Sequence, residues 1–390
     1  MRRVYFDHIA STPVHPQVRE AMLPYLDEFY GNPQSLHSFG QETASAIESA
    51  REKVAGLIEA DAGEVFFTSS GTESNNFAIK GLALAQRAKG NHIVVSAVEH
   101  QSVLHSLKSL EKSGFTATEV PVDQFGCVDP GDVAKAITPE TTLVSVMLAN
   151  GEVGTIEPVR EIVEVCQERG VLCHTDAVDA VGNMHVSVKS LGVDALSLAG
   201  NQFYGPTGVG ALFLKKGTRA LPQIDGGIQE SGKRAGSENI AGIVGLGEAA
   251  AIAQKEMDVW ADHVRPLRDK IIERMEQEVG HVILTGHPTN RLPHHASFCV
   301  KFIEGEAMLL NLDMKGIAAA SGSACTSRAL KASHVLLAMG LDHATAQGSL
   351  VFSLVEKNTA EDIDYLFEVF PEIIERLRRM SPLYPNKEEE

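Results

Sequence analysis

Short apolar runs alternate with amphipathic helical patterns between about residue 60 and residue 215, and few folds accommodate such an alternation. Runs with little polar interruption are typical of strands buried on both faces. Strands that alternate with helices predict βαβ units around a parallel sheet. Right-handed crossovers would place the loops after these strands at one edge, where α/β folds bind ligands. The predicted strands read EVFFT, HIVVS, TATEVPV, TLVSVML, VLCHTD and ALSLA.

A chain of 390 residues is long enough for a large domain and a smaller one. A helical pattern over residues 249–275 is expected to be interrupted near Pro266 and to lead into the second domain. We therefore expect an α/β protein with a large domain at 15–259 and a smaller α/β domain. The smaller domain would combine residues 1–14 with residues 260–390.

The charge balance narrows the range of partners. Acidic residues number 51 against 34 basic ones, which gives a formal net charge of −17. Such a surface repels nucleic acid and anionic membranes, so we expect neither as a partner. The sequence also has no long uninterrupted apolar stretch, and its first residues lack the apolar core of a signal peptide. These features predict a cytoplasmic protein.

Cysteine usage singles out one thiol. An odd number of scattered cysteines without close pairs favours reduced thiols over a disulfide framework. Cys325 lies in SGSACTS, a stretch without apolar periodicity, and this predicts an exposed loop whose thiol reaches another molecule. The other cysteines are expected to pack as small apolar side chains, namely Cys127, Cys166, Cys173 and Cys299.

Three polar residues follow predicted strands at the ligand-binding edge. Asp176 can pair with the protonated ring nitrogen of a pyridoxal phosphate (PLP) cofactor, or it can cap the next helix. His100 can stack on a flat ring or move protons, although a single histidine is more often structural. Asn150 precedes Gly151 and is equally compatible with a plain turn.

Two glycine-containing turns are candidate anion sites. In FTSSGTESNN, Thr72 and the first backbone N–H groups of a helix can hold a phosphate, but a capping box explains the same residues. In GGIQESGKRAGSENIAGIVG, Arg234 and Ser237 can also hold an anion, and a flexible loop is the alternative.

Taken together, these motifs resemble the cysteine desulfurases of the NifS/IscS type, within the class V aminotransferase family of PLP-dependent enzymes. The resemblance covers nearly the whole chain, in the expected order, and implies the PLP-transferase fold and a homodimer. It is carried by YFDHIASTPVHP, YGNPQSLHSFG, SSGTESNN, SAVEH, NGEVGTIEPV, HTDAV, YGPTGVGAL, RAGSENIAGIVG, RLPHHASF and SGSACTS.

The resemblance implies a chemistry and a role for each candidate residue. In such enzymes a lysine holds PLP, a loop cysteine takes sulfur from substrate cysteine as a persulfide, and an iron–sulfur scaffold protein or another acceptor receives it. The implied roles are persulfide carrier for Cys325, ring-stacking acid–base for His100, pyridinium partner for Asp176, phosphate contact for Thr72, substrate-side contact for Asn150, and phosphate contact across the dimer for Ser237.

The chain departs from the family pattern at the positions that matter most. Gln202 occupies the lysine position, and a carboxamide forms no imine with an aldehyde. Val351 replaces the arginine that would bind the substrate carboxylate. Ala199 and Asn201 replace a phosphate hydroxyl and a histidine, and Asp179 stands where a glutamine would face the cofactor's phenolic oxygen.

These departures predict a PLP-independent relative that acts in sulfur or iron–sulfur cluster metabolism. Cys325 would accept a persulfide or serve as a ligand to an iron–sulfur cluster. One alternative is a residual cysteine desulfurase that binds PLP without a covalent link. The other is a non-catalytic structural or regulatory partner of an active desulfurase, in which Cys325 would be dispensable.

Overall fold

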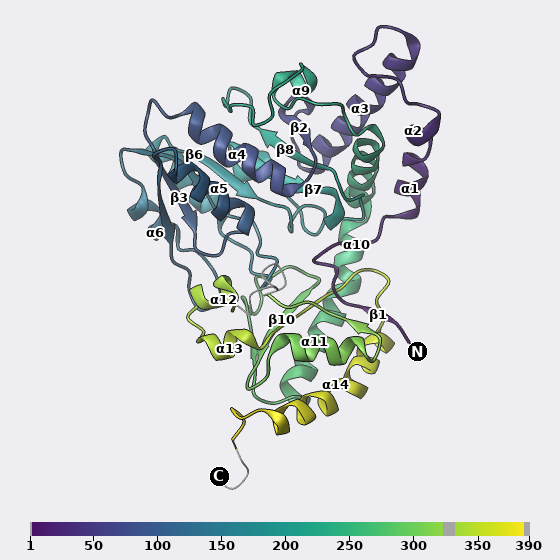
Figure 1. Cartoon of the computed structure of the whole chain (residues 1–390), viewed down its shortest axis with the longest axis vertical. Coiled ribbons are helices and arrows are strands. Elements are labelled where there is room, and N and C mark those ends of the chain that lie inside the picture. Colours follow the sequence, from purple (N-terminus) through teal and green to yellow (C-terminus); the bar gives the residue numbers. More distant parts are fainter. Residues whose placement is uncertain (1, 323–331, 386–390) are drawn as a thin grey trace.

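The computed structural model describes residues 2–322 and 332–385, and its largest sheet has seven strands in the order β2-β8-β7-β6-β5-β3-β4 (Figure 1). Strand β8 is antiparallel to both β7 and β2, and the other pairs are parallel. The predicted α/β fold with a mainly parallel sheet is therefore confirmed. The strands are β2 (Val65–Thr68), β3 (His92–Ser96), β4 (Thr116–Val120), β5 (Thr141–Ser145), β6 (Leu172–Asp176), β7 (Ala195–Ala199) and β8 (Gly210–Leu214).

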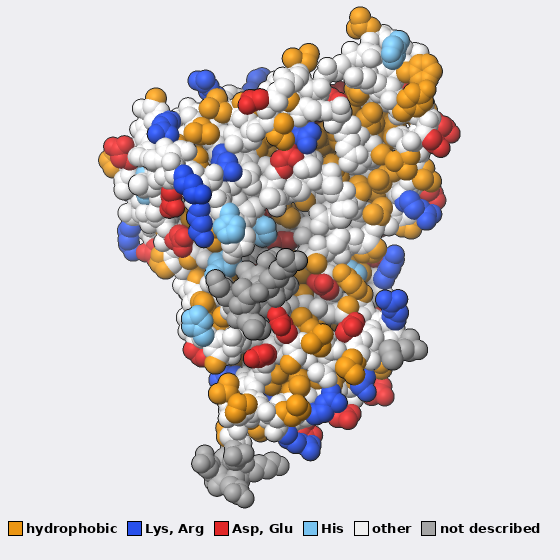
Figure 2. Space-filling view, in the orientation of Figure 1, with side chains coloured by type: hydrophobic (Ala, Val, Ile, Leu, Met, Phe, Trp, Pro, Cys, Tyr) orange, Lys and Arg blue, Asp and Glu red, His pale blue; other side chains and the backbone are white. Residues whose placement is uncertain are grey.

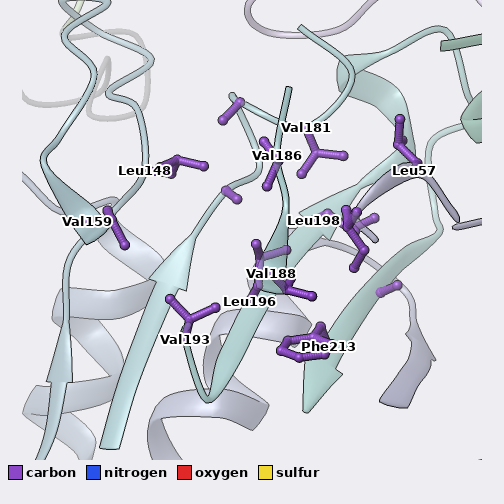
Figure 3. Packing of buried hydrophobic residues seen from close by; sticks show 14 of the residues in the cluster. Leu57, Leu148, Val159, Val181, Val186, Val188, Val193, Leu196, Leu198 and Phe213 are labelled. Atoms are coloured by element: carbon purple, nitrogen blue, oxygen red, sulfur yellow. The ribbon is translucent and has the colours of Figure 1, made fainter. Parts of the chain in front are cut away.

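Helices cover both faces of this sheet, which explains its apolar strands. In β3, Ile93 and Val95 pack in one cluster with side chains of α4 and α5, whereas Val94 joins a second cluster with side chains of α3, α7 and α10. Figure 3 shows part of the second cluster, where Leu196, Leu198 and Phe213 project from β7 and β8. The helices are α3 (Ser38–Leu57), α4 (Gly71–Ala85), α5 (Gln101–Glu111), α6 (Pro130–Ala136), α7 (Val159–Arg169) and α10 (Ile240–Glu278).

Helix α10 runs without a break through Pro266, so the predicted interruption is wrong. A proline in a helix removes one backbone hydrogen bond and crowds the preceding turn. Here Val264 and Leu267 are buried on either side of the ring, and Ile271 is buried one turn later. Tertiary packing of this face thus holds the helix together where local propensity opposes it.

The C-terminal part of the chain builds a separate core. Strands β9 (Val282–Leu284), β10 (His295–Val300) and β12 (Ser349–Ser353) form an antiparallel sheet. Strand β1 (Val4–Tyr5) pairs in parallel with β11 (Ile317–Ala318), and its neighbour Phe6 packs edge-on against Phe352. The domain boundaries stay a prediction, because α10 crosses residue 259. The helices here are α11 (Gly305–Asp313), α12 (His334–Ala338), α13 (His343–Gln347) and α14 (Ala360–Met380).

The remaining elements are short. They are α1 (Pro16–Met22), α2 (Pro24–Asp27), α8 (Val188–Leu191), α9 (Gln229–Gly232) and two 3₁₀ turns, η1 (Ala62–Glu64) and η2 (Gly200–Gln202). Among all helices within residues 2–322 and 332–385, none combines the length and apolar character that a membrane crossing requires.

A buried ion pair ties the loop at α9 to the sheet. Arg51 on α3 donates to both carboxylate oxygens of Glu230, at 2.7 and 2.9 Å. Glu230 also accepts from the backbone N–H of Phe67 at 2.8 Å, and its φ of 47° lies in the left-handed region. The surroundings therefore hold this residue in a costly backbone conformation.

Glu230→Gln should lower the free energy of unfolding by about 3 kcal/mol, because it leaves the Arg51 guanidinium buried without its counter-charge. Urea denaturation of both proteins measures this difference. Glu48→Gln is the matched control, since Glu48 contacts the same arginine from an exposed position and should change stability by less than about 0.5 kcal/mol. Equal losses in the two variants would contradict this role of the pair.

Candidate functional site

The carboxyl ends of the central strands wall a cavity of about 500 Å³. Residues that follow β3, β5, β6 and β7 line one side, as expected for an α/β sheet. The other side comes from the C-terminal core, including Leu309, Val351 and residues 319–322. The site therefore lies between the main sheet and the smaller one.

Asp176 is held at the floor of this cavity by a hydrogen-bonded chain. Asn75 on α4 donates to Asp176 Oδ2 at 2.6 Å and to Ser102 Oγ at 2.9 Å. Ser102 Oγ in turn lies 2.7 Å from Nδ1 of His100, which caps α5. Burial raises the pKa of Asp176, while the charge of His100 and the bonds from Val178 and Asn75 act in the opposite direction. The structure thus brings two predicted site residues together through two others, Asn75 and Ser102.

Thr72 lies in the first turn of α4 and lines the cavity, but the hydroxyl that caps this helix belongs to Ser70. Glu73 reaches back to accept from the backbone N–H of Ser69 at 2.8 Å, and Arg234 donates to it at 2.9 Å. Burial alone would raise the pKa of Glu73, but the bonds from Arg234 and Ser69 outweigh it and lower the pKa. The N-terminus of α4 is therefore capped by Ser70, and the carboxylate of Glu73 lies in its first turn.

Gln202 lies in η2 at the wall of the cavity and is 8% exposed. Its Nε2 donates to the backbone oxygen of Ile9 at 2.9 Å, which ties the segment before α1 to the loop after β7. Ala199 and Asn201 also line the cavity. Because β8 runs antiparallel to β7, Lys215 follows the far end of the strand and lies away from this edge.

Val351 and Asn150 line the cavity and are almost fully buried. The amide of Asn150 serves its own loop, because Nδ2 donates to the backbone oxygen of Val98 and Oδ1 accepts from the N–H groups of Glu152 and Val153. A contact between Asn150 and a substrate stays a prediction. The structure shows Asn150 in a turn, which was the alternative interpretation of this residue. Val351 offers a substrate carboxylate no hydrogen bond donor from its side chain.

One predicted site residue lines a different pocket, and another lies in a part of the chain that the structure does not describe. Ser237 lines a separate pocket of about 60 Å³ with Arg234 and Glu230. Its role across a dimer stays a prediction, since it needs a second chain. Cys325 lies outside the described residues, and its roles as persulfide carrier or cluster ligand rest on the sequence.

Carboxyl groups dominate the charge of the cavity. Among residues 2–322 and 332–385, its lining holds one histidine, His100, and no lysine or arginine. Burial and neighbouring carboxylates raise the pKa of Asp179 to about 8, and burial raises the pKa of Glu152 to about 7. The five acidic residues that line it are Asp7, Glu99, Glu152, Asp176 and Asp179.

Sequence reasoning missed Asp7, Glu99 and Glu152. Glu99 lies in the short loop between β3 and α5, so the position that singled out His100 could also have singled out its neighbour. Its Oε1 accepts from Ser96 and from the N–H of Met147, and it is fully buried. Burial raises the pKa of Glu99 to about 8.

A groove of about 790 Å³ with several basic side chains in its lining adjoins the cavity. It runs along α4 and α5 and shares Thr72, His100, Glu152 and Gly322 with the cavity. Figure 2 shows lysine and histidine side chains over this part of the molecule. The basic residues that line the groove are Lys80, His100, His105, Lys108 and His334.

This fold and this position of the site define a class V aminotransferase: the family model described as Aminotransferase class-V matches residues 4–366, and the chain belongs to that family. Within it, the chain groups with the cysteine desulfurases. It is 49% identical to cysteine desulfurase IscS of Clostridium botulinum over 394 residues, covering 100% of this chain and 99% of the relative.

Two further comparisons agree with this assignment. Cysteine desulfurase IscS of Methanosarcina thermophila is 47% identical over 386 residues, covering 99% of this chain and 95% of the relative. A solved structure described as a NifS-like protein superposes with a TM-score of 0.90 at 36% identity, covering 96% of this chain and 100% of that chain.

PLP is the cofactor of this family, and the residues of this cavity do not fit a covalently held PLP. The carboxamide of Gln202 cannot form an imine, and no described lysine lines the cavity to replace it. The phosphate and the phenolic oxygen of PLP are anionic, and the described lining of the cavity offers them no lysine or arginine. The Asp176–Asn75 pair is the part of the site that still suits a pyridinium ring.

Asp179→Asn should make the protein more stable than the wild type at about pH 8. Unfolded Asp179 loses its proton near 3.8, whereas the folded protein retains it up to about pH 8. The folded state binds more protons in this window, so the free energy of unfolding falls as pH rises through it. Thermal melting across this range measures the effect, and the gain should shrink as pH falls. Asp225→Asn, at an exposed position, is the control and should show no such trend.

Proposed function

We propose that this chain is a PLP-independent member of the cysteine desulfurases, which handles sulfur through Cys325. The observation that carries the proposal is the cavity itself, in which Gln202 lies at the lysine position and no described lysine or arginine is present. Relatives at 49% identity are named cysteine desulfurase IscS. The proposal therefore retains their connection with sulfur but not the cofactor-dependent release of sulfur from cysteine.

The chemistry left to such a protein is transfer of sulfur that has already been activated. The Cys325 thiolate would attack the outer sulfur of a donor persulfide, so that one S–S bond forms, another breaks, and the donor thiolate leaves. This exchange needs no electron sink and no imine. The same thiolate is a suitable ligand for an iron–sulfur cluster shared with a scaffold protein. The partner is then an iron–sulfur scaffold protein or another sulfur acceptor.

A homodimer belongs to the same proposal. Large apolar side chains are exposed from the end of α1 through α2 to the start of α3, and Figure 2 shows apolar side chains at the upper right, where these elements lie. Exposed large apolar side chains gathered in one part of the surface favour association. A dimer would also bring the pocket of Ser237 and Arg234 close to a second chain. The exposed residues are Leu23, Leu26, Tyr30, Leu36 and Phe39.

A residual PLP-dependent desulfurase is the second candidate. The pairing of Asp176 with Asn75, and the proximity of His100, favour it, because both would suit a PLP ring bound without a covalent link. Such an enzyme would release sulfide from cysteine slowly, since neither an imine nor an arginine at position 351 helps to hold the substrate.

The proposal is tested on protein purified without oxygen and without added PLP. We expect iron with acid-labile sulfide, or a mass increase of one sulfur atom, in the wild type. Both signals should vanish in Cys325→Ser and persist in Cys127→Ser. Cys127 is the matched control because burial and neighbouring acids raise the pKa of its thiol to about 12 and make it unreactive.

Two outcomes would overturn the proposal. Sulfide release that depends on added cysteine and PLP, and that Cys325→Ser abolishes, would establish the second candidate. Iron or persulfide that is equally present in Cys325→Ser, or absent from every protein including the wild type, would leave a non-catalytic partner of an active desulfurase.

A further inference from the structure

The wall of the cavity has more hydrogen bond acceptors than donors. Asn75 and Glu99 both line the cavity. Asn75 Oδ1 and Glu99 Oε2 are buried and accept no hydrogen bond from any group in the described chain. Asp7 Oδ1 is in the same state. Unpaired buried acceptors are costly, and they favour a ligand or a proton that donates to them.

The acidic groups also lie close enough to raise one another's pKa. The carboxylates of Asp176 and Glu152 add to burial in raising the pKa of Asp179. Among residues 2–322 and 332–385, few basic side chains lie near them: His100 lines the cavity, and Lys80 and Lys108 line the adjoining groove. Since no described lysine or arginine lines the cavity, protons neutralise these carboxyl groups. A bound cation would take their place.

The remaining surface of the cavity is apolar. Ile9, Met147, Val178, Leu309 and Val351 contribute to its walls. A volume of about 500 Å³ lies within the range of small-molecule sites. The cavity therefore combines an acidic end with an apolar space large enough for a short carbon chain.

We propose that this cavity binds a small organic cation, a primary ammonium group on an apolar stem, in place of the phosphate-bearing cofactor of the family. An ammonium group has three donors and no acceptor, so it complements the carboxyl oxygens of this wall. The ligand's ammonium lies among Glu152, Asp176 and Asp179, the carboxyl groups that act on one another most directly, and its stem contacts Met147 and Leu309. The inference rests on the proposed function, because covalently held PLP would fill the same space.

The test uses three probes with the same stem: hexylamine, hexanol and hexanoate, with inorganic phosphate as a fourth. Calorimetry on the full-length, PLP-free protein at neutral pH should show that hexylamine binds at least about tenfold more tightly than the other three, the ratio expected for one charge-assisted hydrogen bond. Repeating the titration in buffers of different ionisation enthalpy should show that protons are released as hexylamine binds.

Asp179→Asn and Glu152→Gln should each weaken hexylamine binding and reduce the release of protons. Glu161→Gln, at an exposed position on α7, is the control for the loss of one negative charge and should change neither. If a cavity variant fails to fold, two measurements on the wild type still test the inference. Hexylamine should raise its melting temperature more than hexanol does, and binding of hexylamine should release protons.

Three results would overturn the inference. Equal affinity for hexylamine and hexanol would mean that only the apolar wall binds, and tighter binding of hexanoate or phosphate would mean that the site prefers anions. Unchanged hexylamine affinity in both cavity variants would place the ligand elsewhere. PLP content, read from the absorption of the same preparation, separately shows whether the proposed function has failed.

Discussion

Burial of the parallel sheet on both faces is the constraint on which the rest of the structure depends. Because helices cover each face, the inner strands are buried along their length, and the carboxyl ends of β3, β5, β6 and β7 meet at one edge. Every polar residue that follows one of these strands is thereby directed toward one space. The second core closes that space from the other side, with Val351 in its wall. A carboxyl group placed there is desolvated, which explains why the cavity acids share raised pKa values.

The departures from the family pattern change the charge of this space in one direction. Gln202 and Val351 each stand where the pattern has a positive charge, and Asp179 stands where it has a neutral amide. Asn201 replaces a histidine. One such substitution would only weaken the binding of an anionic cofactor. Several substitutions that each remove positive charge or add a carboxyl group change which ligands the cavity can bind. The fold, the Asp176–Asn75 pair and the capped head of α4 are retained around it. The preserved fold and the altered charge are thus compatible, because the strands position the wall whatever charge it carries.

Much of the fold could be predicted from the sequence, because buried strands such as HIVVS carry a local signal in their composition. Pro266 was misleading, since the packing of α10 depends on residues distant in the sequence. The loss of the lysine at position 202 was evident from the motif around it, and the structure adds that the Gln202 amide bonds to Ile9. Asp7 gave no local signal, because tertiary structure alone brings it to the cavity. The same holds for Glu230, whose partner Arg51 lies 179 residues away.

The most direct measurement of the central claim, that this cavity no longer holds PLP covalently, is the intact mass of the protein after incubation with PLP and reduction with borohydride. Proteolytic mapping then locates any reduced adduct, and a relative that retains the lysine serves as the positive control. We expect no adduct on a residue of the cavity, and at most a scattered reaction with exposed lysines. A single stoichiometric adduct on a lysine that reaches the cavity would contradict the claim, because it would show that another amine has replaced the one absent at position 202.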